Sequence, residues 1–79
     1  MWYVYLLECS DGSLYCGITN DLSKRIDTHN KGKGAKYTRT RLPVKLFYNE
    51  TAKDKSEASK REYQIKRMSR ENKLKLKTH

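Results

Sequence analysis

Tyr5 and Tyr15 are the first residues whose side chains could do chemistry, and they lie on either side of the turn-forming stretch 10–13. A phenol combines a large apolar ring with one hydroxyl that can donate a hydrogen bond, accept one or lose a proton. Aromatic residues are common in strands, so a single strand tyrosine is more often a packing residue than a chemical group. A functional reading therefore depends on which other side chains converge on these two phenols.

Arg25 and His29 are the next candidates, because both fall on one side of a predicted helix. The stretch Thr19-Asn20-Asp21 offers N-cap side chains for a helix that begins near Leu22. Leu22, Ile26 and His29 then recur at helical spacing, and Arg25 lies beside that stripe. Either polar residue alone would be read as an ordinary edge or half-buried side chain.

Glu62 lies on the apolar stripe of a second predicted helix, which begins at Asp54 or Ser56 and runs to about Met68. The other inward positions of that stripe are Ala58, Ile65 and Met68. A carboxylate among apolar residues needs a cation close by. Two readings stay open, a structural ion pair with Lys or Arg, or a metal ligand.

The turn between the two tyrosines decides whether their hydroxyls share one face. A two-residue loop, Asp11-Gly12, would pair Cys9 with Leu14 and place the tyrosines on opposite faces. A three-residue loop, Ser10-Asp11-Gly12, would pair Leu7 with Tyr15 and place both on one face. The three-residue loop is favoured because Gly12 suits its last, left-handed position.

A third strand and a last short helix complete the expected elements. Pro43 is predicted to start the strand 44–48, with Val44, Leu46 and Tyr48 on one face, followed by a link over 49–53. Ser69 can cap a short basic helix anchored by Leu74. The prediction is an α+β fold in β-β-α-β-α-α order, a three-stranded antiparallel sheet flanked by helices.

Length and composition bound what this chain can be. Its 79 residues, of which 35% are hydrophobic, make one domain with a small core. The apolar run from Trp2 to Leu7 is too short for a membrane span and lacks the features of a signal peptide. We therefore expect a cytoplasmic protein with no membrane partner, and read Cys9 and Cys16 as free, half-buried thiols.

The net charge of +9 is concentrated after residue 30, where 16 Lys and Arg face five acidic residues. An excess of this size indicates a polyanionic partner, and we expect nucleic acid. Segment 31–41 reads as a flexible basic loop that contacts phosphates, with Tyr37 available to stack on a base. The nucleic-acid-binding candidates in it are Lys33, Lys36, Tyr37, Arg39 and Arg41.

Five motifs together resemble the GIY-YIG nuclease superfamily in order and spacing. They are Tyr3-Val4-Tyr5, Tyr15-Cys16-Gly17, Leu22-Ser23-Lys24-Arg25-Ile26, His29-Asn30 and the helix bearing Glu62. The match covers nearly the whole chain, as a single GIY-YIG domain over 1–79 with a motif core of about 1–76. It is most similar to the small stand-alone bacterial proteins, on the stretches 12–15, 35–38 and 41–44. The chain departs from the pattern with Tyr3 for the first Gly, Cys16 for the second Ile, and Ile18 where some members have Lys.

The resemblance implies a role for each candidate. Tyr15 would help activate the attacking water, and Tyr5 would position or assist it. Arg25 would hold the scissile phosphate, with His29 as a neighbouring polar or proton-transfer group. Glu62 would bind one divalent ion, magnesium or manganese. We expect the hydroxyls of both tyrosines and the side chains of Arg25 and Glu62 to line one shallow concave site on one face of the sheet.

The implied function is that of a metal-dependent endonuclease, structure-selective for DNA and acting in DNA repair or recombination. The alternative is a non-catalytic DNA- or RNA-binding module on the same scaffold. Related nucleases borrow a second DNA-binding domain, so a protein partner that supplies specificity is expected. Asn72 is a weaker candidate for a polar contact.

Overall fold

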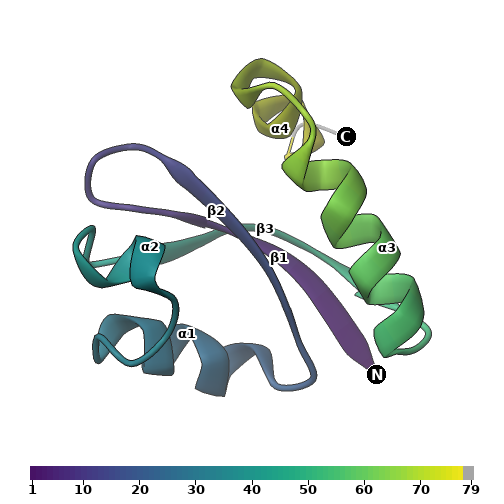
Figure 1. Ribbon diagram of the computed structural model, residues 1–79, viewed down its shortest axis with the longest axis horizontal. Coiled ribbons are helices and arrows are strands. Elements are labelled where there is room, and N and C mark those ends of the chain that lie inside the picture. Colours follow the sequence, from purple (N-terminus) through teal and green to yellow (C-terminus); the bar gives the residue numbers. More distant parts are fainter. Residues whose placement is uncertain (78–79) are drawn as a thin grey trace.

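Three antiparallel strands form the centre of the protein, and helices lie against both faces of the sheet (Figure 1). The structure, a computed structural model, describes residues 1–77. Its elements are β1 (Trp2–Glu8), β2 (Leu14–Thr19), α1 (Leu22–Asn30), α2 (Lys36–Arg39), β3 (Lys45–Ala52), α3 (Lys55–Lys66) and α4 (Arg70–Leu76). The strand order is β2-β1-β3, so β1 is central and β2 is an edge strand. The predicted fold class is confirmed, with one addition: a four-residue helix, α2, lies within the segment predicted as a flexible loop.

The β1–β2 hairpin has the three-residue loop that Gly12 favours. The Cys9 amide donates to the Ser13 carbonyl at 2.9 Å, and the Gly12 amide donates to the Cys9 carbonyl at 2.9 Å. Gly12 has a φ of +82°, a conformation that costs little only without a Cβ. Leu7 pairs with Tyr15, and Tyr5 pairs with Gly17. Tyr5 and Tyr15 therefore project from the same face of the sheet.

The core has two layers, one on each face of the sheet. Val4, Leu6 and Cys16 pack against α3, through Ala58 and Ile65. On the opposite face, the buried residues Tyr5, Leu7, Cys9 and Val44 pack with Leu22 and Ile26 of α1. The two cysteines are free, as expected, but they are buried where half-buried thiols were expected, and they belong to opposite layers.

Strand β3 is longer than predicted and is bent by a bulge. It continues to Ala52, where a link was expected. Its pairing with β1 shifts between Leu6, which faces Tyr48, and Leu7, which faces Leu46. One extra residue reverses the alternation of side chains. The prediction that Val44, Leu46 and Tyr48 share a face is therefore wrong: Val44 packs with α1, and Tyr48 packs on the α3 side.

Polar side chains fix where the helices begin. Asp21, Asp54 and Ser69 each accept a hydrogen bond from a backbone amide three residues ahead, at 3.2, 2.9 and 3.2 Å. The last helix is anchored by Leu76, which packs on the α3-side core, while Leu74 is 38% exposed. No helix within residues 1–77 is long and apolar enough to cross a membrane.

Candidate active site

Helix α1 carries Arg25 and His29 to the face of the sheet from which the two tyrosines project (Figure 1). Leu22 and Ile26 insert into the core of that face, which fixes the rotation of the helix. Arg25 and His29 are one turn apart and therefore both reach toward Tyr5. Four of the five predicted catalytic and metal-binding residues are thus close together on one face.

His29 is fully buried and uses both ring nitrogens. Its Nε2 lies 3.0 Å from the Tyr5 hydroxyl, and its Nδ1 lies 2.8 Å from Oγ1 of Thr38. Burial, and then the charge of Arg25, lower the pKa of His29 from its ordinary value. His29 is therefore a neutral imidazole near pH 7, and Thr38 is a partner that the sequence did not reveal.

Tyr5 is a buried phenol whose oxygen is fully occupied. It meets His29 on one side and accepts a hydrogen bond from Nε of Arg25 at 3.4 Å. Burial raises the pKa of Tyr5 against the opposing effect of Arg25. Tyr5 is consequently a protonated phenol that holds the arginine, and it is not a free base.

Tyr15 differs from Tyr5 in that its hydroxyl makes no hydrogen bond to another described residue. Its ring meets the His29 ring edge-on, with centroids 5.4 Å apart, and stacks on Tyr37 at 5.9 Å with the planes inclined by 24°. Among the hydrogen bonds of residues 1–77, none involves the Tyr15 hydroxyl. The ring is therefore held on two sides while the hydroxyl is available to a ligand.

Two glycines make room for this cluster. The hydroxyl of Tyr5 lies over Gly17, and the ring of His29 lies against Gly34. A Cβ at either glycine would overlap these side chains. The Gly of the second triplet is thus required by the phenol on the neighbouring strand, and Gly34 by the buried imidazole.

Glu62 is not part of this cluster. Its helix, α3, covers the other face of the sheet, where the Glu62 carboxylate contributes, after burial, to raising the pKa of Cys16 to about 11. Within the described chain, Glu62 forms one ion pair, with Nζ of Lys66 at 3.4 Å. The expectation that Glu62 lines the same face as the tyrosines is therefore wrong, because the face of the sheet on which α3 packs is the one opposite α1.

The residues present fit a magnesium ion only in a limited way. Within the described part of the chain, no group of three or more His, Cys, Asp and Glu side chains could enclose a metal. Glu62 has a half-buried carboxylate, 24% exposed, whose partner Lys66 is itself exposed. Magnesium keeps several waters and often takes one or two carboxylates plus substrate phosphates, so a single glutamate is a sufficient protein ligand.

The predicted nucleic-acid-binding residues divide into two groups. Lys33, Lys36 and Arg39 are exposed, whereas Arg41 is engaged within the protein. Nε of Arg41 pairs with Asp11 at 3.0 Å, and its Nη1 donates to the Tyr37 carbonyl at 2.8 Å. The guanidinium also lies 4.0 Å from the centre of the Tyr37 ring. Arg41 thus ties the hairpin turn to α2, and the Tyr37 ring contacts Arg41 and Tyr15.

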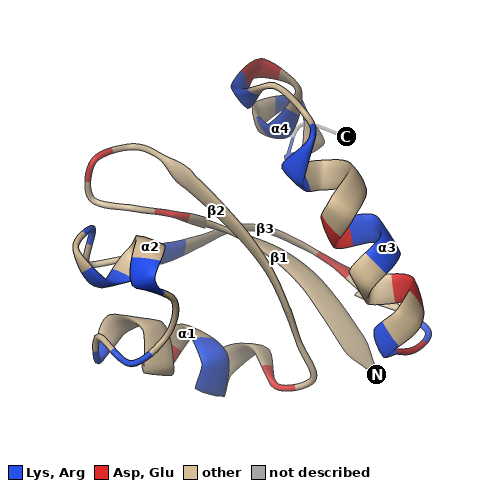
Figure 2. Ribbon diagram, in the orientation of Figure 1, with Lys and Arg blue, Asp and Glu red and all other residues tan. Residues whose placement is uncertain are grey.

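Basic side chains flank the sheet on two sides. Figure 2 shows Lys and Arg on α1 and α2 and again along α3 and α4, while the hairpin strands carry few charges. Arg70 of α4 donates to the Gly12 carbonyl at 2.6 Å and so links the last helix to the hairpin turn. The backbone amide of Asn72 donates to Oγ of Ser69, the N-cap of α4, and Asn72 is exposed.

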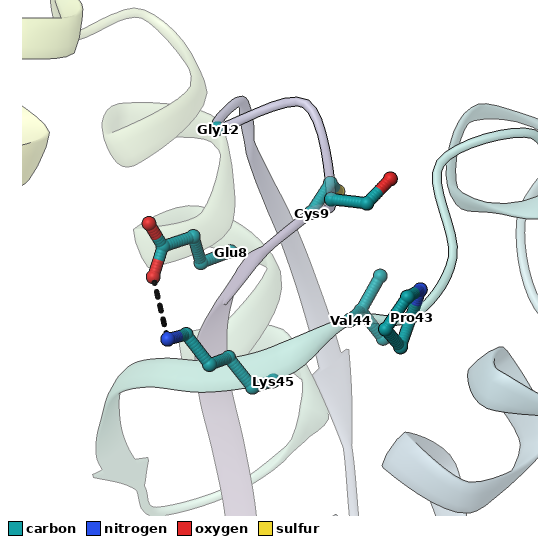
Figure 3. Close-up of a pocket in the computed structure, with 7 residues that line it drawn as sticks. Glu8, Cys9, Gly12, Pro43, Val44 and Lys45 are labelled. Carbon is teal, nitrogen blue, oxygen red and sulfur yellow. Dashed lines mark ion pairs between the residues drawn. The ribbon is translucent and has the colours of Figure 1, made fainter.

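Two pockets lie near the face of the sheet that α1 covers. One, shown in Figure 3, sits beside the hairpin turn, with the Glu8–Lys45 ion pair of 3.5 Å at its edge and Cys9 and Pro43 in its wall. It contains none of the predicted site residues. The other is a shallow hollow at the start of α1 that is lined in part by Lys24 and Arg25. Asp21 also lines this hollow, but its two cations give it a net positive lining that suits an anionic group such as a phosphate.

Comparison with known proteins assigns the chain to a family. The sequence model of the GIY-YIG catalytic domain matches residues 1–75. A UPF0213 protein of Bacillus licheniformis is 61% identical over 71 residues, covering 90% of this chain and 73% of the relative. A UPF0213 protein of Staphylococcus saprophyticus is 58% identical over 74 residues, covering 94% of this chain and 90% of the relative.

Two solution NMR structures have the same architecture. The UPF0213 protein from Bacillus halodurans is 49% identical, with a TM-score of 0.60 over 96% of this chain and 82% of that one. A protein from E. faecalis is 41% identical, with a TM-score of 0.62 over 92% and 78%. The chain belongs to the GIY-YIG family, a family of nucleases.

Proposed function

We propose that this protein is a metal-dependent endonuclease that hydrolyses DNA phosphodiester bonds, with selectivity for DNA structure and a role in repair or recombination. The observation that carries the proposal is the available hydroxyl of Tyr15 beside the hydrogen-bonded group Tyr5, Arg25 and His29. A partly buried arginine fixed by a phenol is a preorganised donor for a phosphoryl oxygen. Membership of the GIY-YIG family supports nuclease activity.

Each residue has a distinct task in this mechanism. Arg25 binds a non-bridging oxygen of the scissile phosphate, and the hydroxyl of Tyr5 keeps the guanidinium in place. The Tyr15 hydroxyl accepts a hydrogen bond from the attacking water, which orients a lone pair of the water oxygen toward phosphorus. As the water oxygen bonds to phosphorus, the P–O bond to the leaving oxygen breaks; the water gives up one proton to the solvent and the leaving oxygen takes one up from it. The neutral His29 stabilises Tyr5 and, through it, the arginine.

The metal is assigned to Glu62. A magnesium or manganese ion held there would neutralise charge that develops on the phosphoryl oxygens. Although α3 lies on the other face, Glu62 is close to the edge strand β2, because its carboxylate contributes to the raised pKa of Cys16. We infer that the scissile phosphate sits at this edge, with the tyrosine cluster on one side and Glu62 on the other.

Binding is proposed to be led by phosphates. The exposed cations Lys33, Lys36 and Arg39 lie on the α1–α2 side. Further cations follow α3 and α4 on the other side, so charge flanks the edge strand (Figure 2). DNA is the proposed partner and RNA the alternative, with a protein partner that narrows the substrate and a cytoplasmic location.

The test is cleavage of a panel of branched, flapped and fully paired DNAs, each with magnesium, manganese or a chelator. Tyr15→Phe is the matched variant, since it removes one hydroxyl, and Tyr63→Phe is the control because Tyr63 is 63% exposed on α3. We expect metal-dependent cutting of one branched class that is lost only in Tyr15→Phe. Salt-dependent binding without cutting of any DNA would overturn the proposal and support the non-catalytic module.

A further inference from the structure

Thr38 is a fully buried polar residue in the four-residue helix α2. Its hydroxyl has one hydrogen, which it donates to the carbonyl of Ala35 at 3.0 Å. The same oxygen lies 2.8 Å from Nδ1 of His29. With its hydrogen already used, the Thr38 oxygen can only accept from His29.

This arrangement determines which nitrogen of His29 carries the proton. If Thr38 accepts, Nδ1 bears the hydrogen and Nε2 has a free lone pair. The Tyr5 hydroxyl, 3.0 Å away, then donates to Nε2, and its oxygen remains free to accept from Nε of Arg25 at 3.4 Å. Every donor in this chain of four hydrogen bonds has an acceptor.

The opposite tautomer leaves the site incomplete. With the hydrogen on Nε2, His29 and Arg25 would both donate to the Tyr5 oxygen. The Tyr5 hydrogen would then have no acceptor among the described residues, in a side chain that is 1% exposed. Buried polar hydrogens are rarely left unpaired. Hydrogen-bond counting therefore selects the first arrangement.

We propose that Thr38 is a positioning residue, which fixes His29 in the Nδ1–H tautomer and thereby turns the Tyr5 proton toward His29 and the Tyr5 oxygen toward Arg25. The assignment of the tautomer stands on geometry alone. Its effect on cleavage rests on the proposed function. Thr38 acts on the phosphate-binding arginine through two intervening residues, His29 and Tyr5, and touches no substrate.

The surroundings of Thr38 keep it in this position. The Arg41 amide donates to the Thr38 carbonyl at 2.9 Å, and the Arg41 side chain pairs with Asp11 of the hairpin turn. On the other side, Gly34 passes against the His29 ring without a side chain. The contacts between the hairpin turn and α2 thus hold the Thr38 hydroxyl next to the His29 imidazole.

The experiment reads the tautomer directly, by long-range proton–nitrogen correlation NMR on protein labelled at histidine nitrogens. The chain has two histidines, His29 and His79, so a His29→Gln sample assigns the signals. We expect the Nδ1–H form of His29 in the wild type. Thr38→Val, which keeps the shape and removes the hydroxyl, should shift His29 to the Nε2–H form, and Thr38→Ser should restore the wild-type pattern.

Cleavage provides the second readout. Thr38→Val should lower kcat by roughly 10- to 100-fold with KM little changed, by comparison with other residues that orient a reacting group, and Thr38→Ser should recover most of it. Thr40→Val, at an exposed threonine two positions away, is the control. An Nε2–H tautomer in the wild type overturns the proposal, even if Thr38→Val fails to fold. An inactive wild type with the Nδ1–H tautomer would reject only the proposed function.

Discussion

The two tyrosines have different surroundings and should respond differently to loss of the hydroxyl. Tyr5→Phe removes the hydrogen that pairs with Nε2 of His29 and the oxygen that receives Arg25. A buried group left unpaired costs about 1–3 kcal/mol, so the free energy of unfolding should fall by that amount. Tyr15→Phe removes a hydroxyl that has no hydrogen-bond partner within residues 1–77, and stability should change by less than about 0.5 kcal/mol. The free energy of unfolding of both variants is measured in urea, with Tyr63→Phe as control. Equal losses of stability in Tyr5→Phe and Tyr15→Phe would contradict the prediction that only the Tyr5 hydroxyl is needed for folding.

His29 also makes stability depend on pH in a definite direction. Its pKa is lowered by burial and by Arg25, and its other neighbours Tyr5, Tyr15 and Thr38 carry no negative charge. The folded protein therefore binds fewer protons than the unfolded chain, in which histidine has a pKa of about 6.5. The contribution of His29 is complete above that pH and is lost as pH falls toward its folded pKa.

The check is the free energy of unfolding measured from about pH 7.5 to about pH 5, in the window set by the histidine pKa. The wild type should lose stability through this window more steeply than His29→Gln, which cannot titrate. The lowered pKa of Asp11 acts only at more acidic pH and does not interfere. Parallel curves for the two proteins would mean that His29 is not held neutral by the fold.

At the scale of the elements, α1 and α3 could be predicted well and α2 could not. Caps at Asp21 and Asp54 and the apolar spacing are local signals, and both helices begin where these signals place them. Thr38 carries no such signal. Its burial depends on Arg41 and on the close approach of Gly34 to His29, contacts that form only after the chain has folded.

The difference between local signals and contacts made only on folding also explains two wrong predictions: the face of the sheet on which Glu62 lies, and the alternation of side chains in β3. The apolar stripe of α3 shows that Glu62 points inward, but not which side of the sheet the helix covers. The register of the hairpin was predictable because Gly12 is a local requirement of the turn. The bulge opposite Leu6 and Leu7 has no local requirement in β3, so the alternation of Leu46 and Tyr48 was assigned wrongly.

Helix α3 also settles how Glu62 should respond to substitution. The structure gives it an exposed partner, Lys66, and therefore no buried cation that would be stranded by its loss. Glu62→Gln should change stability by less than about 1 kcal/mol, the range of exposed ion pairs. If Glu62 holds the metal, cleavage should fall by more than about 100-fold, since loss of a charge-stabilising group costs that much.

The matched control is Glu71→Gln, which makes the same charge change at an exposed i,i+4 pair of 3.7 Å. Melting temperature and magnesium titration of cleavage are measured for both variants beside the wild type. A large drop in the melting temperature of Glu62→Gln with unchanged cleavage would defeat the metal assignment. Equal loss of cleavage in both variants would show a general effect of charge.

At the scale of the whole molecule, the charge of +9 predicts how binding responds to salt. Each phosphate contact that is lost should reduce the slope of log affinity against log salt by about 0.9. Alanine at Lys33, Lys36 and Arg39 together should therefore flatten the slope by about 2 to 3. Arg41 is left in place because it holds α2 to the hairpin turn.

The control removes the same charge elsewhere, with alanine at the exposed residues Lys53, Lys55 and Lys60 around the start of α3. Fluorescence anisotropy with labelled duplex DNAs of two unrelated sequences, over a range of salt, gives both slopes. Since phosphate contacts carry no sequence information, the first triple variant should weaken binding to both DNAs alike. If the control triple flattens the slope equally, Lys33, Lys36 and Arg39 contribute no more to DNA binding than the cations around the start of α3, and the α1–α2 side is not a distinct binding surface. A loss confined to one sequence would instead mean that these side chains read bases.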